Sequence, residues 1–536
     1  MQPIPEKETL TIEFKSDLEG YADDELIDEI VGMANTEGGM LYLGVEDDGT
    51  PSGLIDRHKD TIGLCALVAN KTVPSLSVRA ALMEQDGITV MRIEIGKSSA
   101  IVASSRGRVL RRRLKADGTP ENVPMYPFEM TSRLSDLRLL DLSAQPLNGA
   151  VMEDLDPAQI IRLKEQIRKR EADPTLQELT EEELLRVLHM SARSEGREVP
   201  TLTGMLLAGR EARLQELVPT MRTEFQVLRG TSVVLNRTYT KPLIELRGML
   251  DELFQAYNPE EEMEEGPYVT AIPAFSARAF REGVNNAFAH RDYSLLGSVR
   301  IQISDNGLVI SNPGGFVDGI TAQNVIFAEP EGRNLALADA FKRIGLVERT
   351  GRGVDRIYEG SIRYGRPWPD YAESTSKTVR LFIPRAKADL RFYKNIEEIT
   401  RRRGKPLSIE TLLVLSAVAC QGIHSEEGLL SVTHIRPERM QLLLEEMRLE
   451  GILKPGEIRA ANPPQGAGGA KEKEAILTNT QEGDTVRKRD VVNLLGVSEA
   501  QAYRLLKQLQ QEGHLEIVNA GRYAKYRRVT PGQNGS

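Results

Sequence analysis

Three side chains that could act on a nucleotide recur at four-residue intervals between Arg281 and Tyr293. They are Glu282, Asn286 and His290, in the run Arg-Glu-Gly-Val-Asn-Asn-Ala-Phe-Ala-His-Arg-Asp-Tyr. Residues spaced in this way lie on one face of a helix. A carboxylate and an amide oxygen there suit a hydrated Mg²⁺, which prefers hard oxygen ligands and keeps waters between the protein and a phosphate. The spacing therefore indicates nucleotide chemistry.

Two glycine-containing segments follow this predicted helix. Asn312, Gly314 and Gly315 come directly after a strand-like run, and Gly351 and Gly353 lie further along the chain. Glycine allows backbone N–H groups to approach phosphates closely. Taken with the helix, the two segments favour a nucleotide-binding fold.

The helix and the glycine segments resemble the ATP-binding fold shared by DNA gyrase, heat-shock chaperones, histidine kinases and MutL proteins, the GHKL fold. The resemblance is to the divergent version in bacterial regulators often labelled RecG-like helicases, and it covers about residues 180–385. It implies an α/β sandwich that binds ATP and Mg²⁺. Glu282 would orient or deprotonate the attacking water in a slow ATPase, and Asn286 would hold the metal. The other implied nucleotide contacts are His290, Asn312, Gly314, Gly315, Arg333, Asn334, Gly351 and Gly353.

The chain departs from this family at the box that contacts the adenine amino group, because Asn312 stands where a carboxylate is usual. Asp305, Asn306 and Gly307 imitate the missing box. They lie between two β-type runs, however, and Asn-Gly in that position is a strong hairpin signal, so we interpret them as a turn. The missing carboxylate leaves open a nucleotide-free scaffold with a degenerate ATPase fold.

Composition limits the remaining possibilities. At 536 residues the chain should form roughly three to five domains. Cys65 and Cys420 stand alone, which argues against a disulfide framework or a zinc knuckle. No run approaches the ~20 apolar residues of a membrane span and the N-terminus lacks an apolar signal core, so we expect a cytoplasmic protein. The net charge of −9 argues against uniform nucleic-acid binding, although arginines cluster locally.

The N-terminal segment carries a second set of polar residues. Glu8 and Glu13 precede Phe14 and Lys15, and a predicted helix leads to Asn-Thr-Glu-Gly-Gly at residues 35–39. This combination resembles the Alba-like domain of Schlafen proteins, an α+β fold, over residues 1–130. In Schlafen nucleases two glutamates and an aspartate form a metal-dependent RNA-cleaving cluster. The resemblance maps this cluster to Glu8, Glu13 and either Glu46 or Asp47.

A binding role for this domain is the alternative to cleavage. Glu13 and Lys15 lie on one face of a strand and could form an ordinary ion pair. Arg111, Arg112 and Arg113 lie where relatives carry a ligand-facing strand, and guanidinium groups suit phosphate. The chain lacks the tyrosine and the Gly-Ser-Ser turn of those relatives, and residues 114–118 stand there instead.

No helicase motor is expected. Gly96, Lys97 and Ser98 imitate the end of a P-loop, but Met91 stands where that motif requires its first glycine.

The remaining segments read as helices and a C-terminal DNA-binding unit. The domains we expect are residues 1–130, a helical connector at 131–180, the ATP-binding domain at 181–388, a helix-turn-helix-like domain at 389–459, a linker at 460–474 and a winged helix at 475–530. Helices are expected at 156–172, 176–190, 243–257, 408–419, 436–450, 486–495 and 499–512, with an acidic loop at 259–266 and a two-stranded wing at 513–529.

Basic residues of the winged helix are the expected DNA contacts. On the second helix the expected contacts are Arg504 and Lys507, together with the side-chain amide of Gln501. The wing contributes Arg522, Lys525, Arg527 and Arg528. Leu505, Leu506 and Leu509 should turn inward. Winged helices also serve as dimerisation modules.

These features favour an ATP-responsive DNA-binding regulator of transcription or of a stress response. The alternatives are a Schlafen-like metal-dependent nuclease under ATP control and a nucleotide-free scaffold. The expected partners are double- or single-stranded DNA or RNA, with no membrane. We expect a homodimer or a higher even-numbered oligomer, because a two-fold protein matches a pseudo-palindromic site.

Overall fold

The computed structural model describes most of the chain. The described residues are 4–170, 173–265, 268–329, 332–347, 353–454, 457–458, 473, 475–480, 485–495, 502, 505–507, 509–510, 514–519 and 525–528. They form two compact units, Met1–Leu412 and Leu413–Ser536. Within the described part, no helix has both the length and the apolar character needed to cross a bilayer.

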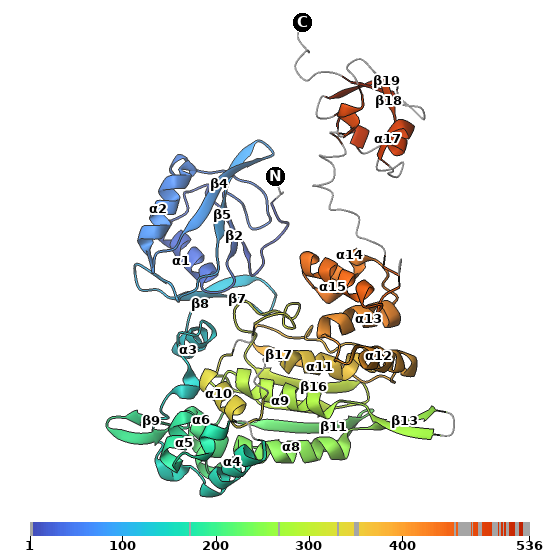
Figure 1. Ribbon diagram of the computed structural model, residues 1–536. Helices are drawn as coiled ribbons and strands as arrows, with labels where there is room; N and C mark the ends of the chain where they lie inside the picture. The colour runs from blue at the N-terminus through green and yellow to red at the C-terminus, as the bar shows by residue number, and fades with distance from the viewer. Residues whose placement is uncertain are drawn as a thin grey trace. The chain divides into compact units, whose positions relative to one another are not determined.

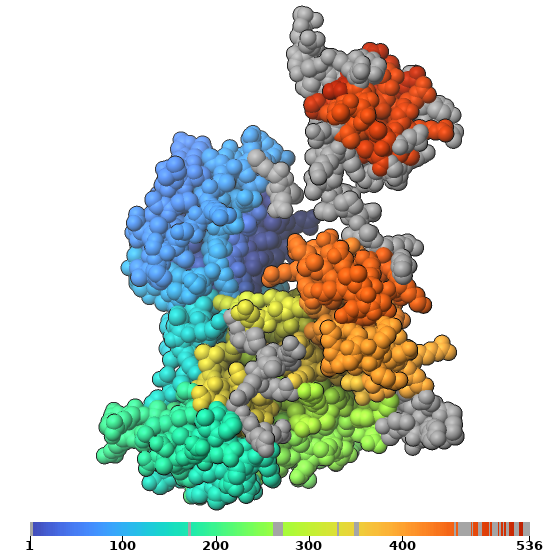
Figure 2. Space-filling model, viewed as in Figure 1, coloured from blue at the N-terminus to red at the C-terminus, as the bar shows by residue number. Residues whose placement is uncertain are grey.

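The first unit opens with a four-stranded sheet in the order β1-β2-β5-β4. Strand β1 runs parallel to β2, and the other neighbours are antiparallel. Apolar side chains of helix α1, such as Leu26 and Ile30, are fully buried against this sheet. The space-filling view shows the resulting α+β body in blue (Figure 2). The elements are β1 (Ile12–Lys15), α1 (Asp23–Ala34), β2 (Gly39–Leu43), α2 (Thr61–Lys71), β3 (Thr72–Val73), β4 (Val78–Gln85), β5 (Ile88–Ile95) and β6 (Ala103–Ser104).

A hairpin and a helix follow this sheet. Strands β7 (Leu110–Leu114) and β8 (Pro120–Pro124) are antiparallel. Helix α3 (Pro127–Asp136) begins after Tyr126, whose backbone N–H donates to the Glu129 carboxylate at 2.9 Å. This helix contributes to the candidate site described below.

The connector and the start of the next domain are mainly helical. The expected helix at 156–172 is α4 (Pro157–Arg170), whereas the one at 176–190 is shorter than predicted. It is α5 (Glu181–Val187), capped by Thr180, and the chain then turns at His189 with φ 55°. The following elements are β9 (Ser191–Ser194), β10 (Arg197–Pro200), α6 (Leu202–Ala208) and α7 (Glu211–Leu217).

The largest sheet has five strands in the order β12-β11-β15-β16-β17. Strands β11 and β15 are parallel, and the other pairs are antiparallel. Figure 1 shows helices α8, α9 and α11 along this sheet. The elements are β11 (Thr223–Arg229), β12 (Ser232–Tyr239), α8 (Leu243–Tyr257), α9 (Ala277–His290), β15 (Val299–Ile303), β16 (Gly307–Pro313), α10 (Leu335–Arg343), α11 (Gly353–Ile362) and β17 (Thr378–Pro384).

Two local predictions for this domain have different outcomes. The turn at Asp305–Gly307 is confirmed, because it joins β15 to β16 and the Ser304 N–H donates to the Gly307 carbonyl at 2.9 Å. The acidic loop at 259–266 is wrong, because most of it is strand β13 (Glu260–Glu265), paired with β14 (Tyr268–Pro273). Backbone pairing with a partner strand outweighs the low strand propensity of glutamate.

Helix α12 (Leu390–Arg403) closes the first unit and was not predicted. The cluster of arginines at 401–403 forms its last turn, ahead of Gly404 in the left-handed conformation at φ 66°. Cations there compensate the negative end of the helix dipole, which is a structural role for this basic cluster.

The second unit contains helices and a small sheet. The segment expected to hold two helices has three, namely α13 (Ile409–Gln421), which begins in the first unit, α14 (Glu426–Thr433) and α15 (Pro437–Leu449). Further on, α17 (Lys488–Leu495) follows β18 (Thr485–Arg487), so the helix expected from 486 starts later. The sheet order is β18-β20-β19, with β19 (Leu515–Asn519) and β20 (Lys525–Arg528). Leu505, Leu506 and Leu509 are buried with Tyr526, as predicted for the three leucines.

Candidate nucleotide site

Helix α9 carries the residues that the sequence singles out. Ser276 caps the helix, accepting a hydrogen bond from the Ala279 N–H at 3.3 Å. Glu282 is 6% exposed, while Asn286 and His290 are half-buried. The predicted helix is therefore confirmed, and it places an acid and an amide one turn apart. Their roles toward a nucleotide stay predictions.

Two glycines bring helix α11 close to α9. A Cβ at Gly353 would collide with the Glu282 carboxylate, and one at Gly360 would lie 2.8 Å from the Cβ of Ser276. The first contact is near the middle of α9 and the second at its start, so the two helices run antiparallel. Glu282 consequently lies against the backbone at the beginning of α11, where unpaired N–H groups favour negative charge.

The Glu282 carboxylate is buried but makes no hydrogen bond or ion pair with another described residue. Burial raises its pKa, and the charges of Arg356, Arg247 and Arg278 oppose this rise. A carboxylate with a raised pKa is a better proton acceptor than an exposed one, which suits a general base. None of these arginines was predicted from the sequence. Arg278, one turn before Glu282, could have been found from helical spacing, whereas Arg247 and Arg356 come from α8 and α11.

The first glycine segment forms a tight turn at the end of β16. Gly314 has φ +95°, and a Cβ there would collide with the Arg333 guanidinium and lie 2.8 Å from the Asp292 Cβ. A Cβ at Gly315 would lie 2.6 Å from the Ser376 carbonyl oxygen. Asn312 is buried, and its amide Nδ2 donates to the Pro313 carbonyl at 3.2 Å. Both glycines therefore permit a close approach that other residues would block.

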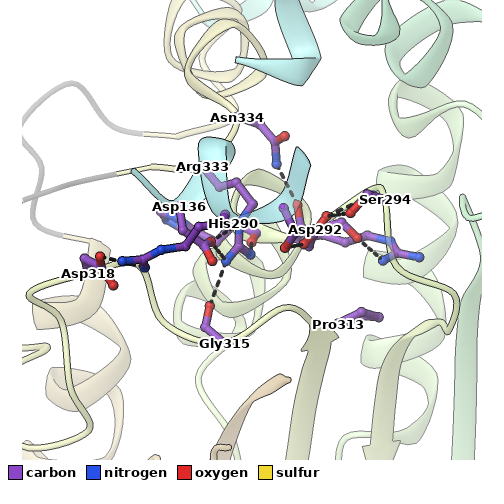
Figure 3. Close-up of polar contacts among 12 residues, drawn as sticks. Asp136, His290, Asp292, Ser294, Pro313, Gly315, Asp318, Arg333 and Asn334 are labelled. Carbon is purple, nitrogen blue, oxygen red and sulfur yellow. Dashed lines mark hydrogen bonds and ion pairs between the residues drawn. The ribbon is translucent and has the colours of Figure 1, made fainter. Parts of the chain in front are cut away.

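Arg333 and Asn334 pack around this turn and the end of α9 (Figure 3). The Arg333 guanidinium donates to the His290 carbonyl at 2.9 Å, to the Gly315 carbonyl at 3.2 Å and to the Asp136 carboxylate, with Nε–Oδ1 at 2.9 Å. The Asn334 amide donates to the carbonyls of Ala289 and Arg291 at 2.9 and 2.8 Å. Both side chains bind their own protein in this structure, and phosphate contact by either stays a prediction.

The histidine of the motif is part of the same assembly. Burial and the neighbouring Arg333 charge lower the pKa of His290 to about 4. The next two residues have structural roles, because Arg291 donates to several backbone carbonyls and Asp292 accepts from Ser294 N at 2.9 Å. The neutral imidazole lies beside Gly332, where a Cβ would be 3.7 Å from its Cε1 atom.

Helix α3 docks onto this assembly through three polar contacts, none of which the sequence analysis anticipated. Ser132 donates to the Asp292 carboxylate, Arg133 to Asp318 at 2.9 Å, and Asp136 accepts from Arg333. Figure 3 shows Asp136 and Arg333 next to Gly315, with Asp318 further to the left.

A cleft of about 930 Å³ adjoins this contact. Its walls come from several segments of the first unit, namely Glu37, residues 97–99, residues 136–138, the loop at 316–323 and the loop from Tyr371 to Ser376. Phe316 and Tyr371 form an edge-to-face aromatic pair in its wall at 5.7 Å. The volume is within the range of small-molecule sites.

The donors present are compatible with Mg²⁺ held largely by waters and phosphate, as that ion prefers. Asn286 supplies an amide oxygen next to the buried carboxylate. In the described residues no group of three or more His, Cys, Asp or Glu side chains is arranged to hold a metal ion. Gly351 lies outside the described residues.

Two of the carboxylates suggested for nuclease chemistry, Glu8 and Glu13, make contacts within the protein. Glu13 pairs with Lys15 and with the buried Arg112, which is the ion-pair alternative considered above. Glu8 accepts a hydrogen bond from the Phe14 N–H at 2.9 Å, and Asp47 is exposed. Among the described residues, none of these carboxylates belongs to a group of three or more His, Cys, Asp or Glu side chains that could hold a metal ion.

The neighbouring arginines also contact acidic side chains. Arg111 pairs with Glu129 of α3, and Arg113 pairs with Glu121 of β8 at 2.7 Å. Nucleic-acid binding by the three-arginine run stays a prediction.

In the C-terminal unit the basic residues differ in exposure. Lys507 and Arg527 are exposed, and Arg527 contacts Glu516 at 3.1 Å. Lys525 is half-buried, while Arg528 donates to the carbonyls of Leu477 and Thr480. Gln501, Arg504 and Arg522 lie outside the described residues.

Comparison with known proteins assigns families to three segments. Residues 8–118 match the family "Schlafen, AlbA_2" and residues 297–383 match "Putative ATP-dependent DNA helicase recG C-terminal". Residues 133–224 match a domain of unknown function. Comparison with curated proteins found no match.

Two solved structures are similar to parts of the chain. The crystal structure of the DIP2311 protein from Corynebacterium diphtheriae is 22% identical over 82% of this chain and 88% of its own, with a TM-score of 0.48. The N-terminal domain of a RecG-related protein from Nitrosomonas europaea is 24% identical over 17% of this chain and 65% of its own, with a TM-score of 0.15.

Proposed function

Because the chain joins a Schlafen AlbA-like domain to a RecG C-terminal-like domain, we propose that it is an ATP-responsive nucleic-acid-binding protein. Its finer role is that of a DNA-binding regulator of transcription or of a stress response. ATP acts as a signal that is bound and slowly hydrolysed in the first unit.

This proposal rests on the buried carboxylate of Glu282, a residue of α9 that lies beside the start of α11. It lies against Gly353, lacks an ion-pair partner among the described residues, and has a pKa raised by burial. A carboxylate in this state can accept a proton from an attacking water. Arg278 and Arg356 provide positive charge beside it, which suits a phosphate.

Magnesium, when bound with ATP, would neutralise phosphate charge. Asn286, one turn after Glu282, would hold it through its amide oxygen. The Gly314–Gly315 turn makes room for the Arg333 guanidinium at the end of β16, and this cation would contact a phosphate.

DNA binding is assigned to the second unit. Lys507 and Arg527 are exposed on a helical segment and on strand β20 respectively, the two positions from which such a unit contacts a groove and the backbone. The protein has two states that differ in their affinity for ATP. The factor by which ATP changes DNA affinity cannot exceed the ratio of the ATP affinities of these two states.

Substitutions on α9 test the nucleotide assignment. Glu282→Gln should retain ATP but stop its hydrolysis, and Asn286→Ala should lose Mg²⁺-dependent ATP binding. Glu359→Gln is the matched control, because Glu359 also interacts with Arg356 but lies on α11. The control should bind and hydrolyse ATP like the wild type. If Glu282→Gln and Asn286→Ala also do so, the assignment is wrong.

A further inference from the structure

Arg333 occupies a position that suits a phosphate as well as a carboxylate. Its side chain is 2% exposed and donates through Nε and Nη2 to Asp136, while Nη1 is fixed by the His290 carbonyl. A guanidinium group presents the same pair of donors to either kind of anion. It also lies directly over Gly314, where the absence of a Cβ leaves room for it.

Its present partner, Asp136, is not in a favourable environment. Burial raises the pKa of Asp136 despite the Arg333 charge, and the nearby Asp292 adds like-charge repulsion. A doubly charged phosphate would interact more strongly with the guanidinium group than this single carboxylate does. The ion pair is therefore open to competition.

This ion pair is one of three polar contacts that attach helix α3 to the nucleotide domain. Asp136 is the last residue of α3, and Ser132 and Arg133 make the other two contacts, to Asp292 and Asp318. The same face of α3 contacts the N-terminal domain, because Arg133 also donates to the Ser98 carbonyl at 2.7 Å and Glu129 pairs with Arg111. Helix α3 therefore connects Asp136 to the Schlafen-like domain.

We propose that Asp136 binds Arg333 at the position that a nucleotide phosphate would take. A phosphate that arrives at the Gly314–Gly315 turn displaces Asp136 from Arg333 and releases the end of helix α3. This inference rests on the proposed ATP binding and adds to it the contact by which the pocket controls the N-terminal domain. The occupant is a nucleoside polyphosphate, and a nucleoside without phosphate has no effect on α3.

Amide hydrogen exchange of residues 127–136 in the full-length protein tests the release. In the wild type, ATP with Mg²⁺ should accelerate exchange in α3, and adenosine should not. Asp136→Asn should show fast exchange without nucleotide and should bind ATP about tenfold more tightly, a factor that corresponds to about 1.4 kcal/mol.

Asp318→Asn is the matched control. It weakens the contacts of Asp318 with Arg133 and with Lys97 and loosens α3, but it leaves the pair between Asp136 and Arg333 intact. Its ATP affinity should equal that of the wild type. An equal gain of affinity in Asp318→Asn and Asp136→Asn would overturn the inference, because loosening alone would then explain it.

The outcomes separate this inference from the proposed function. If the wild type binds ATP but exchange in α3 does not change, displacement of Asp136 is wrong and ATP binding stands. If neither the wild type nor Asp136→Asn binds ATP, both are wrong. Release of α3 by adenosine would also contradict a phosphate-driven exchange.

Discussion

The carboxylate of Glu282 lies so close to the Cα of Gly353 that any Cβ at position 353 would collide with it. This contact joins the middle of α9 to the beginning of α11. It also fixes the direction in which the buried carboxylate points. Helices α9 and α11 are separated in the sequence by the hairpin of strands β15 and β16. Together they form one side of the candidate nucleotide site.

Gly353→Ala should therefore impair nucleotide binding. The added methyl group must push Glu282 or the first turn of α11 aside, and overpacking of this kind typically costs about 1–3 kcal/mol. We expect at least a tenfold loss of ATP affinity, which a titration would measure; a factor of ten is about 1.4 kcal/mol.

Gly360→Ala provides the comparison, because its Cβ would lie 2.8 Å from the Ser276 Cβ and away from Glu282. It should reduce stability while retaining ATP affinity in the folded protein. Equal ATP affinities for Gly353→Ala and Gly360→Ala would contradict the role given to the Glu282 contact.

Stability of the first unit should fall as the pH drops from about 6.5 to about 4, in part because of His290. Its folded-state pKa is lowered to about 4. An unfolded histidine has a pKa of about 6.5, so in this window the unfolded chain binds more protons and is favoured. At pH 5 the effect is up to about 2 kcal/mol.

His290→Gln should make the first unit less sensitive to acid. Urea unfolding at pH 7 and pH 5 can be followed through Trp368, the one tryptophan of the chain, which lies in the first unit. His424→Gln, an exposed histidine of the second unit, serves as the control. An unchanged pH dependence in His290→Gln would show that the imidazole is not held neutral.

Local sequence signals predicted the elements of the site better than its contacts. The α8 range was predicted to the residue, and the helix carrying Glu282 and the turn at Asp305–Gly307 were also found, since periodicity and turn chemistry are local. Strand β13 was missed because its formation depends on a partner strand.

The docking of Asp136 on Arg333 could not be predicted in the same way. The two residues are 197 positions apart, and neither belongs to a motif that predicts the other. The same applies to Arg247 and Arg356, which approach Glu282 from different helices.

Glu13→Gln should destabilise the N-terminal domain. Its side chain is 7% exposed and pairs with Arg112, which is 1% exposed. Removing one partner of a buried pair leaves the other charge uncompensated, at a cost of about 3–5 kcal/mol. Faster hydrogen exchange in α1 would report the loss, and native exchange rates would contradict the structural role of the pair.

The nuclease alternative makes a different prediction for the same domain. Metal-dependent cleavage would require Glu8 as well as Glu13, whereas the structural account does not assign Glu8 an ion pair. RNA and single-stranded DNA should stay intact after incubation with the wild type and Mn²⁺. Cleavage that Glu8→Gln abolishes without loss of stability would establish the nuclease instead.

Arg527 and Arg528 should behave differently although they are neighbours on β20. Arg527 is exposed, so Arg527→Ala should weaken DNA binding and reduce the salt dependence by about one counterion. Arg528 binds the carbonyls of Leu477 and Thr480, so Arg528→Ala should destabilise the C-terminal unit. Salt titrations of DNA affinity together with thermal unfolding separate the two effects. Loss of stability in Arg527→Ala with none in Arg528→Ala would refute this assignment.

The central claim is best tested by titrating the full-length protein with a fluorescent ATP analogue and Mg²⁺, for the wild type and Asn286→Ala, with and without duplex DNA. We predict saturable binding to the wild type that Asn286→Ala abolishes and DNA shifts. Absence of binding to the wild type would contradict the account and leave the first unit as a nucleotide-free scaffold.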